Sequence, residues 1–281
     1  TIPFSFFDAV RADYERGPLH VTAMGALLSS SFSAEVPDPD DPAEVIEAEA
    51  DGQIYGLDVS YAWEERASAG LGFFMRDDDG TKNNASVAAL RGSYAFPVLT
   101  LAGEFAMERG DIGDVDLNGY AFHLDAIHTF NEERETYAKA SYLLFSGDDA
   151  DTEENEGYYP WFYRWNDWSQ YYVGDVVGST MLFNSDVRMM VLEGGTKPGE
   201  AWGLRFLFHR YDLDTAAGVG GLPDGTSKHF ADELDLVADY TLNDFWSFWA
   251  MVAYAKPGEA AKAVYGDDDA TEFFLNATFG F

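Results

Sequence analysis

The chain of 281 residues contains no cysteine, which excludes disulfides and thiolate chemistry. Basic residues are scarce, since 17 Lys and Arg stand against 50 Asp and Glu and give a formal net charge of -33. Such a charge repels phosphate backbones, so we expect no nucleic-acid partner. No run of about 18 uncharged apolar residues occurs, which excludes a bundle of transmembrane helices.

Catalytic motifs are also lacking. The sequence has no His-Glu-x-x-His, Walker, Gly-x-Ser-x-Gly or haem-attachment pattern. His123 and Asp125 lie two apart, and His209 lies near Asp212, but no nucleophile accompanies either pair. We therefore expect no enzyme, no catalytic residue, no metal-ligand set and no organic cofactor.

Acidic residues gather in four short stretches, at residues 35–51, 77–80, 147–157 and 267–269. One interpretation is that they solvate exposed loops. The other is that their carboxylates bind Ca²⁺ in loops that face lipopolysaccharide. None of the four has the spacing of an EF-hand loop.

Period-2 alternation of apolar and polar residues predicts about thirteen strands, each close to the ten residues that a tilted membrane strand needs. No linker or internal repeat interrupts them, so residues 1–281 are interpreted as one domain. The predicted strands are 4–14, 19–32, 53–63, 67–76, 85–96, 98–108, 118–130, 136–146, 186–194, 201–211, 232–242, 245–256 and 272–281.

The connections between these strands alternate between short turns and long loops. This rule is typical of outer-membrane barrels, which have short periplasmic turns and long outer loops. The sequence thus predicts an all-β fold, a transmembrane antiparallel up-and-down β-barrel of about 14 to 18 strands. An odd count of thirteen places Thr1 on the outer side, so either a strand precedes Thr1 or one strand is miscounted.

The last strand has one apolar face, formed by Phe273, Leu275, Ala277, Phe279 and Phe281. It resembles the terminal strand of bacterial outer-membrane β-barrels, which the barrel-assembly machinery reads through a final Phe. The resemblance implies an assembly signal at Phe279 and Phe281. It also implies a Gram-negative outer membrane, with lipid and lipopolysaccharide as partners and the acidic loops facing outside.

Alternation also sorts each strand into an outer and an inner face. Leu234, Leu236 and Ala238 are predicted to face lipid, opposite the acidic residues of the same strand. Charged residues need a wet interior, which indicates a channel; for any single residue, structural pairing between neighbouring strands is an equally good interpretation. The predicted pore-lining residues are Arg91, Glu104, Glu108, Asp125, Lys139, Arg188, Arg205, His209, Glu233, Asp235 and Asp239, with Arg11 and Asp58 on the same predicted interior.

The densest aromatic segment, residues 158–172, lies in the longest connection. Aromatic faces beside hydrogen-bonding groups suit a sugar ring, and a loop folded inward would narrow a pore. The alternative is that these rings pack against each other and the outer aromatic band. The residues of this predicted constriction loop are Trp161, Tyr163, Arg164, Trp165, Asp167 and Trp168.

The carboxy-terminal half resembles the alginate-export type of outer-membrane porin. The likeness rests on Tyr171-Tyr-Val-Gly-Asp, Phe206-Leu-Phe-His-Arg-Tyr-Asp-Leu and Tyr254-Ala-Lys-Pro-Gly-Glu, with shorter matches at residues 184–188, 197–199 and 233–237. It implies an eighteen-stranded barrel that passes polysaccharide or small solutes, with Arg188 and Arg205 as polymer contacts.

Two hypotheses of function follow. The first is a passive channel for polar or charged solutes, including saccharides. The alternative is a scaffold barrel that sheathes or anchors a protein partner, such as an electron-transfer cytochrome or a surface appendage. A conducting pore would favour the first hypothesis, and a stoichiometric partner threaded through the lumen would favour the second.

Overall fold

A computed structural model describes residues 7–28, 34–37, 45–48, 52–64, 66–78, 83–149, 151–158, 185–216, 221–223 and 225–280. Antiparallel strands make up nearly all of its regular structure. The strands of the first half are β1 Phe7–Arg16, β2 Leu19–Leu28, β3 Ala34–Pro37, β4 Val45–Ala48, β5 Gly52–Trp63, β6 Ala67–Asp78, β7 Asn83–Ala95, β8 Thr100–Ile112 and β9 Val115–Leu117. The second half contains β10 Tyr120–Asn131, β11 Thr136–Phe145, β12 Val187–Gly199, β13 Trp202–Leu213, β14 His229–Thr241, β15 Trp246–Pro257, α2 Glu259–Val264 and β16 Ala270–Phe279.

One 14-stranded sheet contains every long strand, in the order β1-β2-β5-β6-β7-β8-β10-β11-β12-β13-β14-β15-β16 with β9 paired to β8. Each long strand therefore pairs with the next long strand in the chain, as an up-and-down meander requires. The thirteen strands predicted from alternation all coincide with these long strands, to within a few residues at each end. The short strands β3, β4 and β9 and the helix α2 were not predicted.

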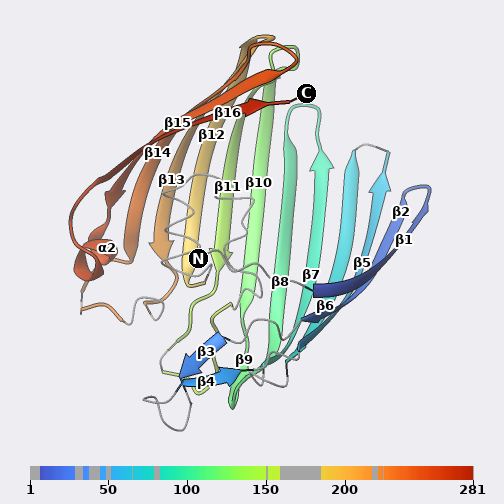
Figure 1. The fold of residues 1–281 in the computed structure, drawn as a ribbon, viewed down its shortest axis with the longest axis vertical. Helices are drawn as coiled ribbons and strands as arrows, with labels where there is room; N and C mark the ends of the chain where they lie inside the picture. Colours follow the sequence, from blue (N-terminus) through green and yellow to red (C-terminus); the bar gives the residue numbers. More distant parts are fainter. Residues whose placement is uncertain are drawn as a thin grey trace.

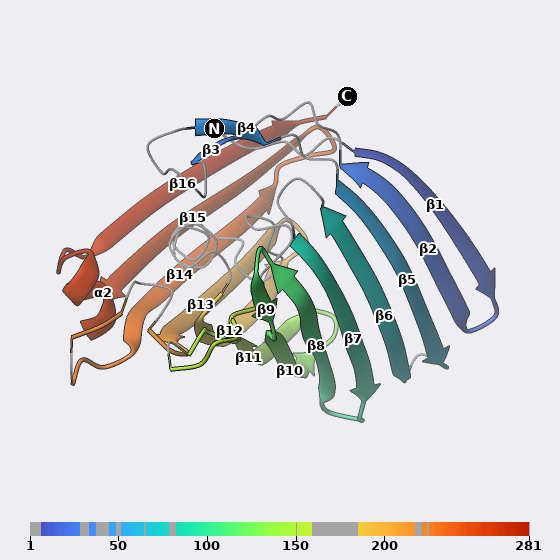
Figure 2. The same cartoon turned by 90° about the horizontal axis from the view of Figure 1, so that it is seen from below.

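The sheet curves into a trough instead of a closed cylinder, with β1 and β16 on the two sides of the opening (Figures 1 and 2). No ladder joins β1 to β16 among the described residues. The predicted barrel is therefore unclosed among the described residues. The physical reason is parity: thirteen antiparallel strands make the first and last run in the same direction, so direct pairing would break the antiparallel pattern.

The two ends of the sheet differ as the sequence predicts. Short turns join the strands at the upper end of Figure 1, and the lower end carries the longer connections together with β9, α2 and the separate β3–β4 hairpin. Pro18 at one turn accepts a hydrogen bond from Ala62, and Asn243 at another caps Phe245 and Trp246 through its side chain. These ends are called the turn end and the loop end below.

The outer face of the sheet is apolar and exposed. On β14, Leu234 and Leu236 are 42% and 57% exposed, while Glu233 and Asp235 on the other face are 1% exposed. This confirms the predicted alternation on that strand. Exposed aliphatic side chains continue around the outer face at Leu57, Leu71, Leu90, Leu192, Val252 and Leu275.

Exposed Tyr and Trp side chains on this outer face gather near the two ends of the strands, whereas exposed Phe residues also lie at mid-strand, as at Phe73 and Phe206. Exposed Tyr, Trp and Phe residues lie near the turn end, and exposed Tyr residues lie near the loop end. This banding is typical of membrane strands, because amphipathic rings favour the boundary between lipid and water. The turn-end band contains Tyr14, Trp63, Tyr94, Phe130, Trp202, Trp246 and Phe279, and the loop-end band contains Tyr55, Tyr120, Tyr142 and Tyr254.

The inner face is not uniformly polar. Its β12–β15 side carries a continuous cluster of buried apolar side chains. The cluster includes Val187, Met189, Val191, Leu207, Tyr211, Val237, Met251, Ala253 and Ala255.

No helix among the described residues is both long and apolar enough to cross a bilayer.

Candidate functional site

The inner face of β5–β11 carries ion pairs that remain partly exposed. We call it the charged wall, and its members are Asp58, Arg91, Glu104, His123, Asp125 and Lys139. The inner face of β12–β15 is called the packed wall, formed by the apolar cluster above together with His209, Glu233 and Asp235.

Arg91 and Asp58 form the best-defined pair of the charged wall. Two guanidinium nitrogens of Arg91 donate to the two carboxylate oxygens of Asp58, at 2.6 and 2.5 Å. The pair spans β6, where Gly70 stands opposite Arg91 and has no side chain to obstruct it. On its other side Arg91 lies opposite Glu104 of β8. The guanidinium thus lies between two carboxylates in a row along the wall.

A second polar group of the charged wall is centred on Asp125 of β10. Its carboxylate accepts a hydrogen bond from the Ser141 hydroxyl at 2.6 Å and lies 3.2 Å from Lys139 Nζ. His123 Nε2 lies 3.0 Å from the same carboxylate. His123 and Asp125, which the sequence places two residues apart, therefore belong to one polar group together with Ser141 and Lys139.

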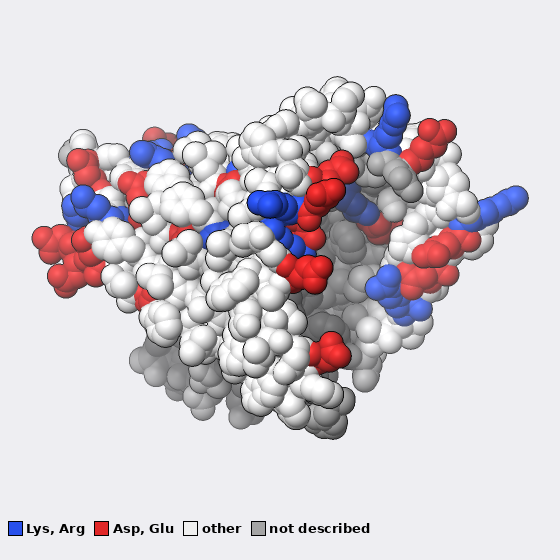
Figure 3. All heavy atoms as spheres, turned by 90° about the horizontal axis from the view of Figure 1, so that it is seen from above, with Lys and Arg blue, Asp and Glu red and all other residues white. Residues whose placement is uncertain are grey.

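Seen from the turn end, basic side chains lie beside acidic ones in several patches, while white residues cover most of the visible surface (Figure 3). At the turn end, Lys197 pairs with Glu135 at 2.6 Å. Arg205 and Asp239 face each other on the inner side of β13 and β14, at 3.7 Å. Opposed charges therefore run along the inner surface and onto its rim.

The structure corrects the predicted position of Arg188. It shares a face of β12 with Met190 and Leu192, which are 40% and 46% exposed on the outer side. Its side chain pairs with Asp214 at the loop end, 2.5 Å away. The prediction that Arg188 lines the pore is wrong, because the inner positions beside it, Val187, Met189 and Val191, are themselves apolar, and the rule of polar residues inside fails on this part of the strand.

Four other predicted pore-lining residues point inward but are shielded from solvent. Glu108 is 0% exposed, and His209, Glu233 and Asp235 are 1% exposed. These four side chains are therefore buried, three of them in the packed wall, and their contact with pore solvent stays a prediction. Arg91, Glu104, Asp125, Lys139, Arg205 and Asp239 lie on the inner face in partly exposed positions.

The predicted constriction loop, Trp161 to Trp168, lies outside the described residues, as does Phe281. The part of this connection just before it is ordered by hydrogen bonds. Ser146 Oγ donates to the Glu156 carbonyl at 2.6 Å, and Tyr158 N donates to the Ser146 carbonyl. Asn155 forms a bridge to Leu117 of β9. Residues 151–158 therefore pack on β9 at the loop end through Asn155.

Charges in this ordered segment perturb one another. Burial, together with the nearby Glu156 carboxylate, raises the pKa of Asp148. Hydrogen bonding from Thr152 lowers the pKa of Glu156. Burial near Glu108 and Glu104 raises the pKa of Tyr158 to about 12, so this phenol stays neutral at physiological pH.

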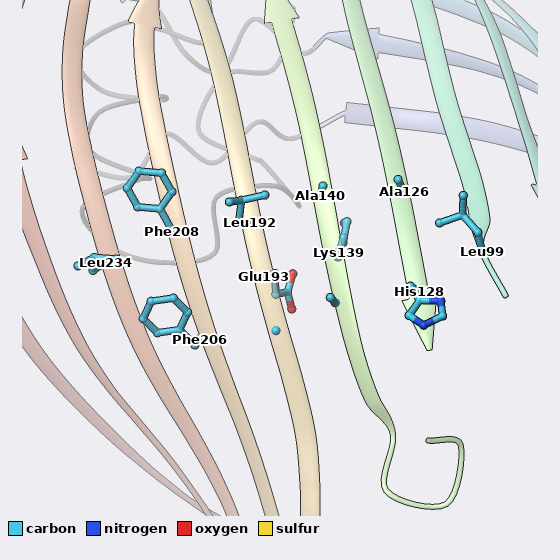
Figure 4. Close-up of a pocket in the computed structure, with 12 residues that line it drawn as sticks. Leu99, Ala126, His128, Lys139, Ala140, Leu192, Glu193, Phe206, Phe208 and Leu234 are labelled. Atoms are coloured by element: carbon cyan, nitrogen blue, oxygen red, sulfur yellow. The ribbon is translucent and has the colours of Figure 1, made fainter. Parts of the chain in front are cut away.

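The outer face has a broad apolar groove over β10–β13, of about 730 Å³. Small side chains form its floor, including Ala126 and Ala140, between Leu99 and His128 on one side and Leu192 and Phe206 on the other (Figure 4). The sequence alternation sends Lys139 and Glu193 to the opposite face. The groove is therefore an apolar depression in the outer surface, separate from the charged wall.

No protein-family model matches the chain, and no curated protein matches it. Among solved structures, OccK11 (OpdR) of Pseudomonas aeruginosa matches with a TM-score of 0.56 at 12% identity, over 98% of this chain and 71% of that one. OccAB4 of Acinetobacter baumannii matches with a TM-score of 0.56 at 10% identity, over 98% of this chain and 64% of that one. An anion-selective porin from Comamonas acidovorans matches with a TM-score of 0.51 at 10% identity, over 97% and 88%.

At these identities the likeness shows the fold alone. The chain has the antiparallel up-and-down β-barrel fold of porins, with a wall that is curved but unclosed among the described residues. The finer resemblance to alginate-export porins is not addressed by these likenesses and stays a prediction.

Proposed function

We propose that this chain forms a passive channel in a bacterial outer membrane, for small polar solutes. The observation that carries the proposal is the contrast between the faces of one sheet. The outer face is apolar with two aromatic bands, as lipid requires. The charged wall on the inner face keeps its ion pairs partly exposed, as a wet lumen requires.

The balance of the partly exposed inner charges favours cations and neutral solutes over anions. Arg91 is matched by two carboxylates, Asp58 and Glu104, and Asp239 faces Arg205. Rings of carboxylates attract cations and repel anions at close range. Neutral saccharides are a second solute class, because the alternating charges offer donors and acceptors along the wall without requiring a charged ligand.

Planar-bilayer recording of the purified, refolded protein tests the channel directly. We expect stepwise conductance, with a reversal potential in a KCl gradient that indicates preference for K⁺. A barrel that stays electrically silent at every salt concentration would refute the proposal. A stoichiometric protein that copurifies with a silent barrel would favour the scaffold alternative.

Selectivity is assigned to the charged wall through Glu104 and Asp58. The double variant Glu104→Gln with Asp58→Asn leaves Arg91 as the dominant charge of its row, so K⁺ preference should fall several-fold and approach anion preference. Glu133→Gln in a turn between β10 and β11 is the matched control, since it removes one exposed carboxylate outside the inner face. An equal effect of the control would assign the selectivity to overall charge instead.

The loop end is proposed to face outside and the turn end the periplasm. Because the native chain has no cysteine, single cysteines report position without background. A membrane-impermeant maleimide applied to intact cells should label Glu153→Cys in the loop segment and leave Glu133→Cys unlabelled until the cells are lysed. The reverse pattern would invert the orientation.

The terminal strand is proposed to be the segment that the barrel-assembly machinery reads, and lipopolysaccharide is the proposed neighbour of the loop end. Phe279 is exposed on the outer face, and its ring centroid lies 4.9 Å from that of Trp246. Phe279→Ala should therefore lower the amount of folded barrel in cells more than it lowers refolding of the purified chain in detergent. An equal loss in both would indicate a packing role alone.

A further inference from the structure

Three side chains with metal-binding atoms meet inside the packed wall. His209 of β13 stands directly opposite Glu233 of β14, and Asp235 follows two residues later on the same face. All three are 1% exposed. One ligand atom from each lies within 4.8 Å of the others. The register between β13 and β14 places His209 beside the two carboxylates, which lie on the same face of β14.

Asp235 points to a bound ligand, because its charge is poorly compensated. Within the described part of the chain, neither carboxylate oxygen of Asp235 accepts a hydrogen bond. His209 Nδ1 lies 3.3 Å from Asp235 Oδ2, but this nitrogen makes no hydrogen bond either. A buried carboxylate without hydrogen-bond donors is strongly unfavourable, and metal coordination is one of the few ways to compensate it.

We propose that His209, Glu233 and Asp235 bind a divalent transition-metal ion of the zinc class. One imidazole nitrogen with two carboxylate oxygens is a donor set that suits Zn²⁺ or Co²⁺, whereas Ca²⁺ and Mg²⁺ prefer oxygen alone. Ligand atoms bonded at about 2.0–2.2 Å to one tetrahedral ion lie roughly 3.3–3.6 Å apart. The three ligand atoms, which lie within 4.8 Å of one another, would therefore move together by roughly 1 Å on binding, through side-chain rotation.

The surroundings of the three ligands favour such a site. Tyr211 donates a hydrogen bond to Glu233 Oε2 at 3.2 Å, which orients that carboxylate. On the β15 side, only alanines stand opposite the two carboxylates, Ala253 opposite Asp235 and Ala255 opposite Glu233. On the β13 side, Leu207 stands opposite Asp235. The ion would bridge β13 and β14 and neutralise two carboxylates in an apolar setting.

The role assigned to this ion is structural, since the ligands have no solvent-exposed position for a substrate. The inference does not depend on channel activity. A barrel that conducts ions but binds no zinc would support the proposed function and refute this site. A barrel that binds zinc but conducts no ions would refute the proposed function and support this site.

The test uses the purified whole chain, refolded in detergent and stripped with a chelator. Zinc chloride is added, excess ion is removed, and bound zinc is measured by mass spectrometry together with the thermal midpoint. We expect about one Zn²⁺ per chain and a higher midpoint with zinc, because binding to the folded state alone stabilises it. Co²⁺ should give the visible absorption of a low-coordinate nitrogen and oxygen site.

Asp235→Asn keeps the shape of the side chain and should weaken zinc binding at least tenfold. Asp239→Asn is the matched control, on the same strand and face but paired with Arg205 outside the cluster. Heat-modifiable gel migration verifies that each variant is folded, and His209→Gln replaces Asp235→Asn if the latter does not fold. The proposal is overturned if the native chain binds no zinc, or if folded Asp235→Asn or His209→Gln binds it as tightly as the control.

Discussion

The charged wall and the packed wall belong to one sheet and have the same strand geometry, yet their inner faces differ in hydration. On the charged wall, Arg91 and Asp58 keep 37% and 19% of their side chains exposed and satisfy each other through two short hydrogen bonds. On the packed wall, His209 and Asp235 are almost fully buried, and within the described part of the chain no hydrogen bond joins His209 Nδ1 to the Asp235 carboxylate, 3.3 Å away. A buried and a partly exposed carboxylate on the same sheet therefore differ in how their charge is compensated.

The difference follows from what surrounds each charge. Glycine at Gly70 and Gly72 of β6 leaves the neighbouring inner positions open, so Arg91 extends across the strand to Asp58. Val191, Val237 and Met251 instead surround the polar cluster of the packed wall with buried apolar groups. A charged side chain beside small residues remains accessible to water. A charged side chain enclosed by large apolar residues needs a hydrogen-bond donor, a counter-charge or a metal ion within the protein.

The largest expected effect comes from placing a new charge in the packed wall. Met251→Asp buries a carboxylate at a position that is 2% exposed, which costs several kcal/mol. We expect little or no folded barrel after refolding, measured by heat-modifiable gel migration. The matched change on the charged side, Ser60→Asp on β5, should refold nearly as well as the native chain. Equal folding of the two variants would remove the distinction between the walls.

A smaller effect is expected from filling the gap that Arg91 crosses. A Cβ at Gly70 would lie 2.9 Å from Arg91 Nε, at the movable end of a flexible side chain. Gly70→Ala should therefore fold but displace Arg91 from Asp58, which frees a carboxylate and raises K⁺ preference in bilayer recordings. Gly25→Ala, whose Cβ would meet Tyr55 at an ordinary 3.7 Å, serves as the control and should leave selectivity unchanged.

The smallest effect concerns the loop that connects the two walls. The raised pKa of Asp148 means that its ionised form destabilises the folded loop, and that this loss is relieved as pH falls through the raised value. Asp148→Asn should therefore slow protease cleavage of residues 146–158 at pH 7, by a modest factor that disappears at acidic pH. Asp151→Asn is the control. A gain that persists at acidic pH would assign the effect to packing instead.

Glu156 has the opposite dependence. Because the pKa of Glu156 is lowered in the folded loop, its ionised carboxylate stabilises the loop at every pH above the ordinary pKa of a glutamate. This stabilisation is lost as pH falls through the lowered pKa. The loop should therefore become easier to cleave at strongly acidic pH, both in the native chain and in Asp148→Asn.

The strands and their outward faces were predictable because side chains alternate with a period of two, which is a local property. Leu234, Leu236, Phe273 and Leu275 are exposed on the predicted side. On β12 the same reasoning failed, since Val187 to Leu192 contains apolar residues at both parities and Arg188 is its sole charge. Hydrophobic alternation assigns a face only when one of the two faces is polar.

By itself, the sequence determined the thirteen long strands, their short and long connections and most of their outward faces, because neighbouring residues along one strand fix these properties. Only the tertiary structure showed how the sheet curves into a trough (Figure 2), with no ladder between β1 and β16 among the described residues. It also decided that Glu233 and Asp235 are buried beside His209 while Asp58 pairs with Arg91. Burial and partnership depend on register, curvature and the size of side chains on neighbouring strands, which are far apart in the chain.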